Sequence, residues 1–120
     1  MEKEFVPYEQ ALALKELGFK EPCIYVFLDK DIIRQNYGLM NYSIQMHPDG
    51  ILAPLYQQVF RWFRDKYELY FNIHRLQHAI STKKEFMLTI DAPLYGGYCE
   101  SYEEAELACL KKLIEIAKSL

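Results

Sequence analysis

Two histidines four residues apart are the first residues in this sequence whose spacing could support chemistry. On a helix, His74 and His78 would present two imidazoles on one side, as a metal site requires. The residues around His74 alternate with period two instead, which predicts a strand there and places His78 beyond its end. No carboxylate or thiol lies at a spacing from these two histidines that is typical of a shared metal ion. The third histidine, His47, precedes a Pro-Asp-Gly turn. The sequence therefore predicts no metal site and no bound cofactor.

Three cysteines, Cys23, Cys99 and Cys109, form an odd set without a CxxC pair. This pattern is typical of reduced thiols in a cytosolic protein. Cys23 opens an apolar segment and Cys109 lies on the apolar side of a predicted helix, so we expect both to behave as small buried hydrophobes. Cys99 is expected to be the most exposed of the three. A cysteine nucleophile needs a histidine base and an activating environment, and no catalytic motif appears, so we predict no catalytic residue.

Basic side chains interleaved with aromatic ones suggest a third kind of site, because such groups bind single-stranded nucleic acid by charge and stacking. The candidates lie on one predicted helix and the hairpin after it: Arg61, Trp62, Arg64, Lys66, Arg75, Lys83 and Lys84. The alternative is a solvated helix face on which Arg61 pairs with Asp65. A net charge of −3 and an isoelectric point of about 5.6 favour the alternative, since nucleic-acid modules usually carry a basic field.

Aromatic residues are the main departure from average composition, with ten Tyr, seven Phe and one Trp. Tyrosine combines a large apolar body with a polar tip, so it serves at the edge of a core and equally in a contact with a partner. Both interpretations stay open from composition alone.

The length of 120 residues predicts a single domain over residues 1–120. The charged N-terminus has no apolar stretch behind it, so no signal peptide is expected. No run of eighteen apolar residues occurs, which argues against a membrane-spanning helix. These features predict a cytoplasmic protein without a membrane partner.

In the first half of the chain, the elements are marked by proline and glycine. Pro7 and Gly18 frame an apolar stripe, which predicts a helix over 7–17. The β-branched and aromatic run at 23–28 predicts a buried strand. Looser alternation predicts a second strand over 39–47, pairing with the first as a hairpin.

The second half begins with the clearest amphipathic helix, predicted over 55–67 after Pro54. Alternating segments at 69–76 and 86–90 then predict a second hairpin, with its loop at 77–85. We interpret Gly96-Gly97 as a turn before the last helix.

That last helix is predicted over 102–118. Ser101 and Glu104 are expected to form a capping box. In it, the serine hydroxyl accepts a hydrogen bond from the Glu104 N–H, and the Glu104 carboxylate accepts one from the Ser101 backbone N–H. The apolar residues expected on its buried face are Ala105, Cys109, Leu113, Ile116 and Leu120.

The order helix, hairpin, helix, hairpin, helix predicts an α+β fold. Because each hairpin has one apolar face, a merged antiparallel sheet of about four strands, covered on one side by helices, would bury all the apolar surface.

Three stretches of the chain resemble small uncharacterised proteins encoded by phages and prophages of Bacteroides-type bacteria. They are VPYEQALALKELGF at 6–19, APLYQQVFRWFR at 53–64 and SYEEAELACLKKLI at 101–114, about a third of the chain. The resemblance implies a phage-derived protein but transfers no activity or site residues. Residues 29–52 and 74–100 lie outside it.

Three functions remain in order of preference. The first is a non-enzymatic interaction module whose exposed aromatics contact another protein or a second copy of the chain. The second is a nucleic-acid-binding protein that uses the basic and aromatic candidates named above. The third is a small enzyme with a cleft near Cys99 or His74.

Overall fold

The structure is a computed structural model that describes residues 4–21, 23, 25–29, 32–35, 51–76, 86–91 and 95–120. The chain divides into two compact units, residues 1–59 and residues 60–120, which are described separately. Both units combine helices with antiparallel strands, so the α+β class is confirmed. The single domain expected over 1–120 stays a prediction.

Helix α1 (Tyr8–Glu16) of the first unit agrees with the helix predicted over 7–17. Pro7 precedes it in an extended conformation, and Gly18 follows it with φ of 95°. The Gly18 N–H donates to the Lys15 backbone carbonyl, and the Phe19 N–H donates to that of Leu14. These are the two hydrogen bonds of a Schellman motif. The helix therefore ends where the glycine can adopt the left-handed conformation.

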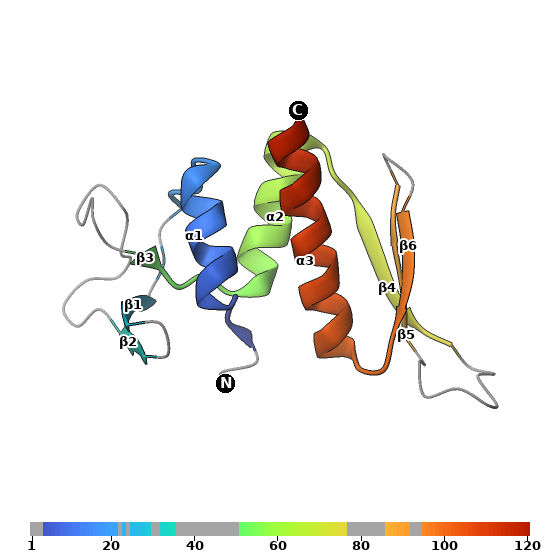
Figure 1. Ribbon diagram of the computed structural model, residues 1–120, viewed down its shortest axis with the longest axis horizontal. Helices are drawn as coiled ribbons and strands as arrows, with labels where there is room; N and C mark the ends of the chain where they lie inside the picture. The colour runs from blue at the N-terminus through green and yellow to red at the C-terminus, as the bar shows by residue number, and fades with distance from the viewer. Residues whose placement is uncertain are drawn as a thin grey trace. The chain divides into compact units, whose positions relative to one another are not determined.

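The first unit holds a three-stranded antiparallel sheet in the order β2-β1-β3, next to α1 in Figure 1. Strand β1 (Tyr25–Asp29) lies in the centre, between β2 (Ile32–Gln35) and β3 (Ile51–Leu52). The strand predicted at 23–28 is thus confirmed, although it begins two residues later. The expected partner at 39–47 lies outside the described residues.

Among the described residues, strand β1 has a neighbouring strand on both sides, whereas its expected pairing with 39–47 stays a prediction. At Phe27, Ile33 lies on one side and Ile51 on the other. Strand β1 pairs with β2 antiparallel, with a shift in register between Phe27 and Asp29.

Helix α2 (Tyr56–Tyr67) begins at the boundary of the two units and continues into the second. Its start is stabilised by Gln58, whose side-chain Oε1 accepts the Leu55 N–H at 3.0 Å. Its end is marked by Glu68, which has a positive φ of 56°. The helix predicted over 55–67 is confirmed, with its apolar side buried: Tyr56, Val59, Phe60, Trp62 and Phe63.

The second unit contains a three-stranded antiparallel sheet in the order β4-β5-β6. Its strands are β4 (Phe71–Arg75), β5 (Phe86–Ile90) and β6 (Tyr95–Cys99). The first two confirm the predicted hairpin, whose loop at 77–85 lies outside the described residues. Strand β6 corrects the interpretation of Gly96-Gly97, because both glycines lie inside a strand and pair with Thr89 and Leu88.

The prediction of a single sheet of about four strands is therefore wrong, because the described residues form two sheets of three strands each. One sheet belongs to each unit. The order of elements is α1-β1-β2-β3-α2-β4-β5-β6-α3.

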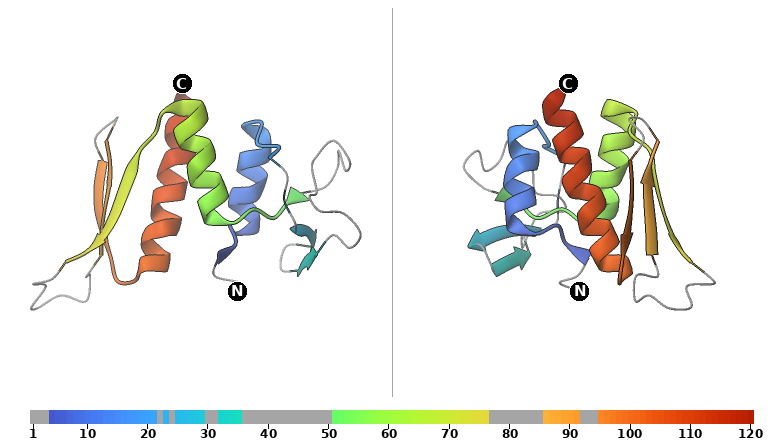
Figure 2. Two further views of the ribbon diagram at one scale, coloured as in Figure 1. Left: turned by 180° about the vertical axis from the view of Figure 1, so that it is seen from behind. Right: turned by 45° about the vertical axis from the view of Figure 1, so that its right-hand side comes forward.

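Helix α3 (Tyr102–Ser119) covers one side of the second sheet, as Figures 1 and 2 show. Its buried residues are Ala105, Cys109, Leu110, Leu113, Ile114, Ile116 and Ala117. Leu120, which we expected on this buried face, is 81% exposed because it follows the last residue of the helix.

The start of α3 has the predicted cap with one difference. The Glu104 N–H donates to the Ser101 hydroxyl at 3.1 Å, as expected. The Glu104 carboxylate, however, accepts the N–H of Glu100 at 3.1 Å instead of the Ser101 N–H. The carboxylate thus reaches one residue further back and ties the exit of β6 to the helix.

Removal of this cap is expected to destabilise the protein. Replacing Ser101 by alanine should lower the free energy of unfolding by about 1 kcal/mol, because the Glu104 N–H loses its acceptor. Urea unfolding followed by circular dichroism measures the change. Ser119→Ala serves as the control, since that hydroxyl donates to a carbonyl at the other end of the same helix. An equal loss in both variants would contradict the capping role.

Candidate functional site

The sheet of the second unit has one side that α3 does not cover, which we call the open face. Strand register places its residues in two rows across the three strands. In the first row, Met87 pairs with His74 on one side and with Tyr98 on the other. In the second row, Thr89 pairs in the same way with Asn72 and Gly96. Because side chains of a strand alternate between its two faces, these six residues share the open face.

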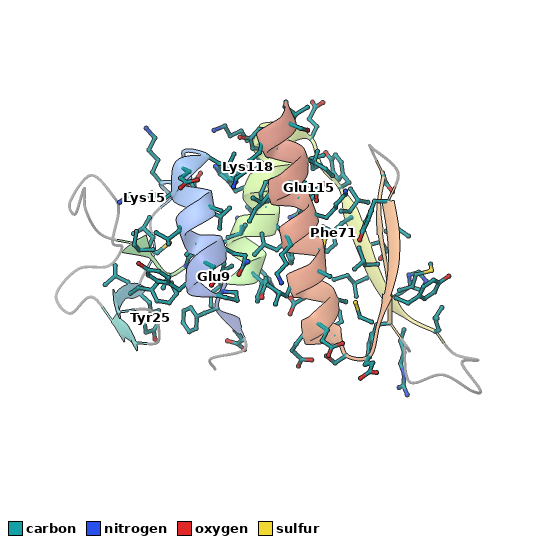
Figure 3. The ribbon with its side chains drawn as sticks, in the orientation of Figure 1. Glu9, Lys15, Tyr25, Phe71, Glu115 and Lys118 are labelled. Atoms are coloured by element: carbon teal, nitrogen blue, oxygen red, sulfur yellow. The ribbon has the colours of Figure 1, made fainter. Side chains whose placement is uncertain are left out.

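Burial agrees with this assignment of faces. On the covered side, Leu88 and Ile90 of the central strand are fully buried. Phe71, labelled in Figure 3, belongs to this covered side, and its ring lies 4.3 Å from that of Phe60 between centroids. On the open face, His74 and Tyr98 are exposed, with 58% of Tyr98 accessible. The apolar packing beneath the sheet therefore fixes which residues face outward.

None of the six open-face residues, all of them described, carries a formal charge with histidine neutral. Charged residues make up 26% of the whole chain, so six residues of average composition would include about one or two. The Met87 thioether and the Tyr98 ring lie on neighbouring strands, where cross-strand side chains interact directly. This arrangement forms an amphipathic surface suited to a partner of low charge.

Sequence reasoning missed Tyr98 and Gly96 because the two glycines were interpreted as a turn. The signal that could have found them is the alternation of Tyr95, Gly97 and Cys99 with Gly96 and Tyr98. Glycine carries no side chain that would display this period, so the strand has only its two tyrosines and Cys99 to mark it.

The basic and aromatic candidates on α2 point in different directions. With 3.6 residues per turn, Lys66 lies about 140° around the helix from Arg61. Asp65 lies about 40° around the helix from Arg61 and so shares its stripe. Arg64 is half-buried on one flank, whereas Arg61 and Lys66 are exposed. The structure thus does not gather these cations on one face of α2.

Trp62 is buried rather than available for stacking on a base. The Lys66 ammonium lies 5.0 Å from the Trp62 ring centroid and 5.4 Å from that of Tyr67, in cation–π range. Arg61 and Asp65, both in the described part of the chain, form no ion pair with each other in the structure. Arg75 is exposed at the end of β4, and Lys83 and Lys84 lie outside the described residues.

The buried cysteines are poor nucleophiles, as expected. Burial raises the pKa of the Cys23 thiol to about 12, and Glu21 adds to the rise. Burial likewise raises the pKa of Cys109 to about 12, with a further contribution from Glu106. A thiol reacts as its thiolate, so both are largely unreactive near neutral pH. Cys99 is half-buried on the covered side of β6, and no disulfide joins any of the three.

The other candidates for chemistry are dispersed. His74 is exposed on β4, and His47 and His78 lie outside the described residues. Within the described ranges, no three histidine, cysteine or carboxylate side chains come together in a way that could hold a metal ion. None of the described helices has the length and apolar character needed to cross a bilayer.

A cluster of carboxylates and a tyrosine occupies the first turns of α3. Burial and the neighbouring Glu103 raise the pKa of Glu106, and burial and Glu106 raise that of Tyr102. The Tyr102 ring contacts that of Phe86 edge-on at 6.1 Å between centroids. These contacts explain the shifts without a bound ligand, so we assign the cluster a structural role.

The fold and the open face together define an α+β protein with a helix-covered antiparallel sheet in its second unit. The comparisons with known proteins add no particular identity to this class. No protein-family model, no curated protein and no solved structure matches the chain.

Proposed function

We propose that the chain is a non-enzymatic protein-interaction module whose contact surface includes the open face. The observation that carries the proposal is that six side-by-side residues on this face are uncharged and include the exposed Tyr98. Tyrosine and methionine are enriched at the centres of protein interfaces, where charged residues are depleted. The partner that fits best is a second copy of the chain, since an uncharged surface is complementary to another like it.

Two exposed residues border the open face, Tyr70 and the charged Asp91. Tyr70, which is 52% exposed, directly precedes β4, and its carbonyl accepts the Asp91 N–H at 3.1 Å. This hydrogen bond joins the residue before β4 to the residue after β5. It therefore fixes the backbone at that end of the two strands. A surface built on paired strands loses little conformational freedom when a partner binds.

The test is the molar mass in solution by light scattering over a range of protein concentrations. We expect a dimer that is unaffected by a single-stranded oligonucleotide at low salt. Replacing Tyr98 by serine should raise the dissociation constant at least about tenfold, because a central interface aromatic is lost. Tyr102→Ser, which removes a 46% exposed tyrosine at the start of α3, is the control and should leave the constant unchanged.

Two outcomes would overturn the proposal. The first is a chain that stays monomeric at every concentration. The second is a monomer that gains mass only when the oligonucleotide is present at low salt, which would favour nucleic-acid binding through Arg61 and Arg64.

The proposal also covers the cellular location and the evolutionary origin of the protein. We infer a cytoplasmic location from three cysteines that form no disulfide with one another, a pattern suited to a reducing compartment. The resemblance to phage-encoded proteins stays a prediction, and the interaction module does not depend on it.

A further inference from the structure

Strand β6 forms one edge of the second sheet. It pairs with β5 on one side, and no strand within the described ranges lies on the other. Exposed edges present unpaired N–H and C=O groups, which proteins usually protect with charged residues, proline or a bulge. Tyr95–Cys99 has no charged residue or proline, and its register with β5 runs through all five residues without a shift. The opposite edge strand, β4, differs because it ends in a charged residue, Arg75.

The residues of β6 are suited to pairing with themselves. In an antiparallel pair about a two-fold axis, the only register that matches all five residues places Gly97 opposite Gly97 of the second copy. Tyr98 then lies opposite Gly96 of the second copy, and the reverse pair forms by symmetry. Both residues belong to the open face, so each tyrosine ring can cover the space left by the facing glycine.

We propose that two copies of the chain associate edge to edge through β6, forming one continuous sheet of six strands with Gly97 at the centre. This inference rests on the proposed function, because it specifies how the second copy binds. Main-chain hydrogen bonds would supply affinity, and the two Tyr98–Gly96 pairs would fix the register. The open faces of both copies would then form one uninterrupted surface.

The first test compares the same charge at two places on the open face. Tyr98→Lys puts an ammonium group on the pairing edge, whereas Asn72→Lys puts it on the far strand β4. We expect Tyr98→Lys to raise the dimer dissociation constant at least about tenfold, as charged edge residues do. Asn72→Lys should leave it within about twofold, since no contact of the proposed dimer includes β4. Circular dichroism checks that both variants are folded.

A dimer weakened equally by both substitutions would overturn edge pairing while leaving the interaction module in place, because it indicates face-to-face contact. A chain that never dimerises would overturn both. The two proposals can therefore fail separately.

The second test measures the register directly by disulfide formation. In a Cys99→Ser background, one chain carries Gly96→Cys and another carries Tyr98→Cys. Residues directly opposite on antiparallel strands have Cα atoms about 4.5–5.5 Å apart, which a disulfide can bridge. Diagonal residues are about 7–8 Å apart and bridge poorly.

Mixing the two chains under mild oxidation should therefore give a linked dimer that contains one chain of each kind, and far less of it when either chain is alone. Mass spectrometry identifies the product. Equal yields from the mixed and the separate chains would contradict this register. Light scattering on the same samples shows whether a dimer is present at all.

Discussion

Replacing Phe63 by alanine is expected to remove about 3–5 kcal/mol from the free energy of unfolding. Phe63 is fully buried on α2, and its ring contacts those of Trp62 and Tyr67 at centroid distances of 5.1 and 5.9 Å. Its backbone carbonyl also accepts the Leu69 N–H just beyond the helix, so the residue anchors the turn into β4. Truncation leaves a cavity that the surrounding rings cannot fill, and urea unfolding measures the cost.

Arg61→Ala is the matched control on the same helix. Arg61 is exposed and alanine favours the helical conformation, so its effect should stay within about 0.5 kcal/mol. A loss at Phe63 no larger than the loss at Arg61 would show that the centre of α2 is not packed as described.

The thiol of Cys109 is expected to react about a thousandfold more slowly in the folded protein than in urea at pH 8. Its pKa is raised from 9.0 to about 12 in the folded state, chiefly by burial. At pH 8 the thiolate fraction is then about one in ten thousand, against about one in ten when unfolded, and the thiolate is the reactive form. Site-resolved mass spectrometry after alkylation gives the rate.

The pH dependence provides a separate check on the cause. In the folded protein the rate should rise about tenfold per pH unit until the pH approaches 12, because the thiol stays protonated over that range. In urea it should level off above about pH 9. A Cys109 rate that levels off near pH 9 in the folded protein would show that the thiol is solvated.

The helices were predictable because their signals are local. Pro7 and Gly18 bracket α1, and Ser101 with Glu104 marks the start of α3. The apolar stripe of α2 is set by a period of 3.6 residues that no other element produces. Helix ends and buried faces therefore agreed with the sequence, apart from Leu120.

The sheets were harder to predict because strand pairing depends on distant residues. Nothing near Phe27 indicates that Ile51, 24 residues later, will occupy its free edge. Strand β6 was missed because two adjacent glycines usually indicate a turn. Here, pairing with β5 keeps both glycines in an extended conformation. The open face combines residues from three strands, so it could not be assembled before β6 was known.

Trp62 also provides an intrinsic fluorescent probe of unfolding. It is the only tryptophan in the chain, it is buried, and a lysine ammonium lies above its ring. The entire indole emission therefore originates from one position on α2, and unfolding would transfer that ring from an apolar setting to water. Fluorescence can follow the loss of this helix without any label, while the eight tyrosines outside α2 report on the rest of the chain.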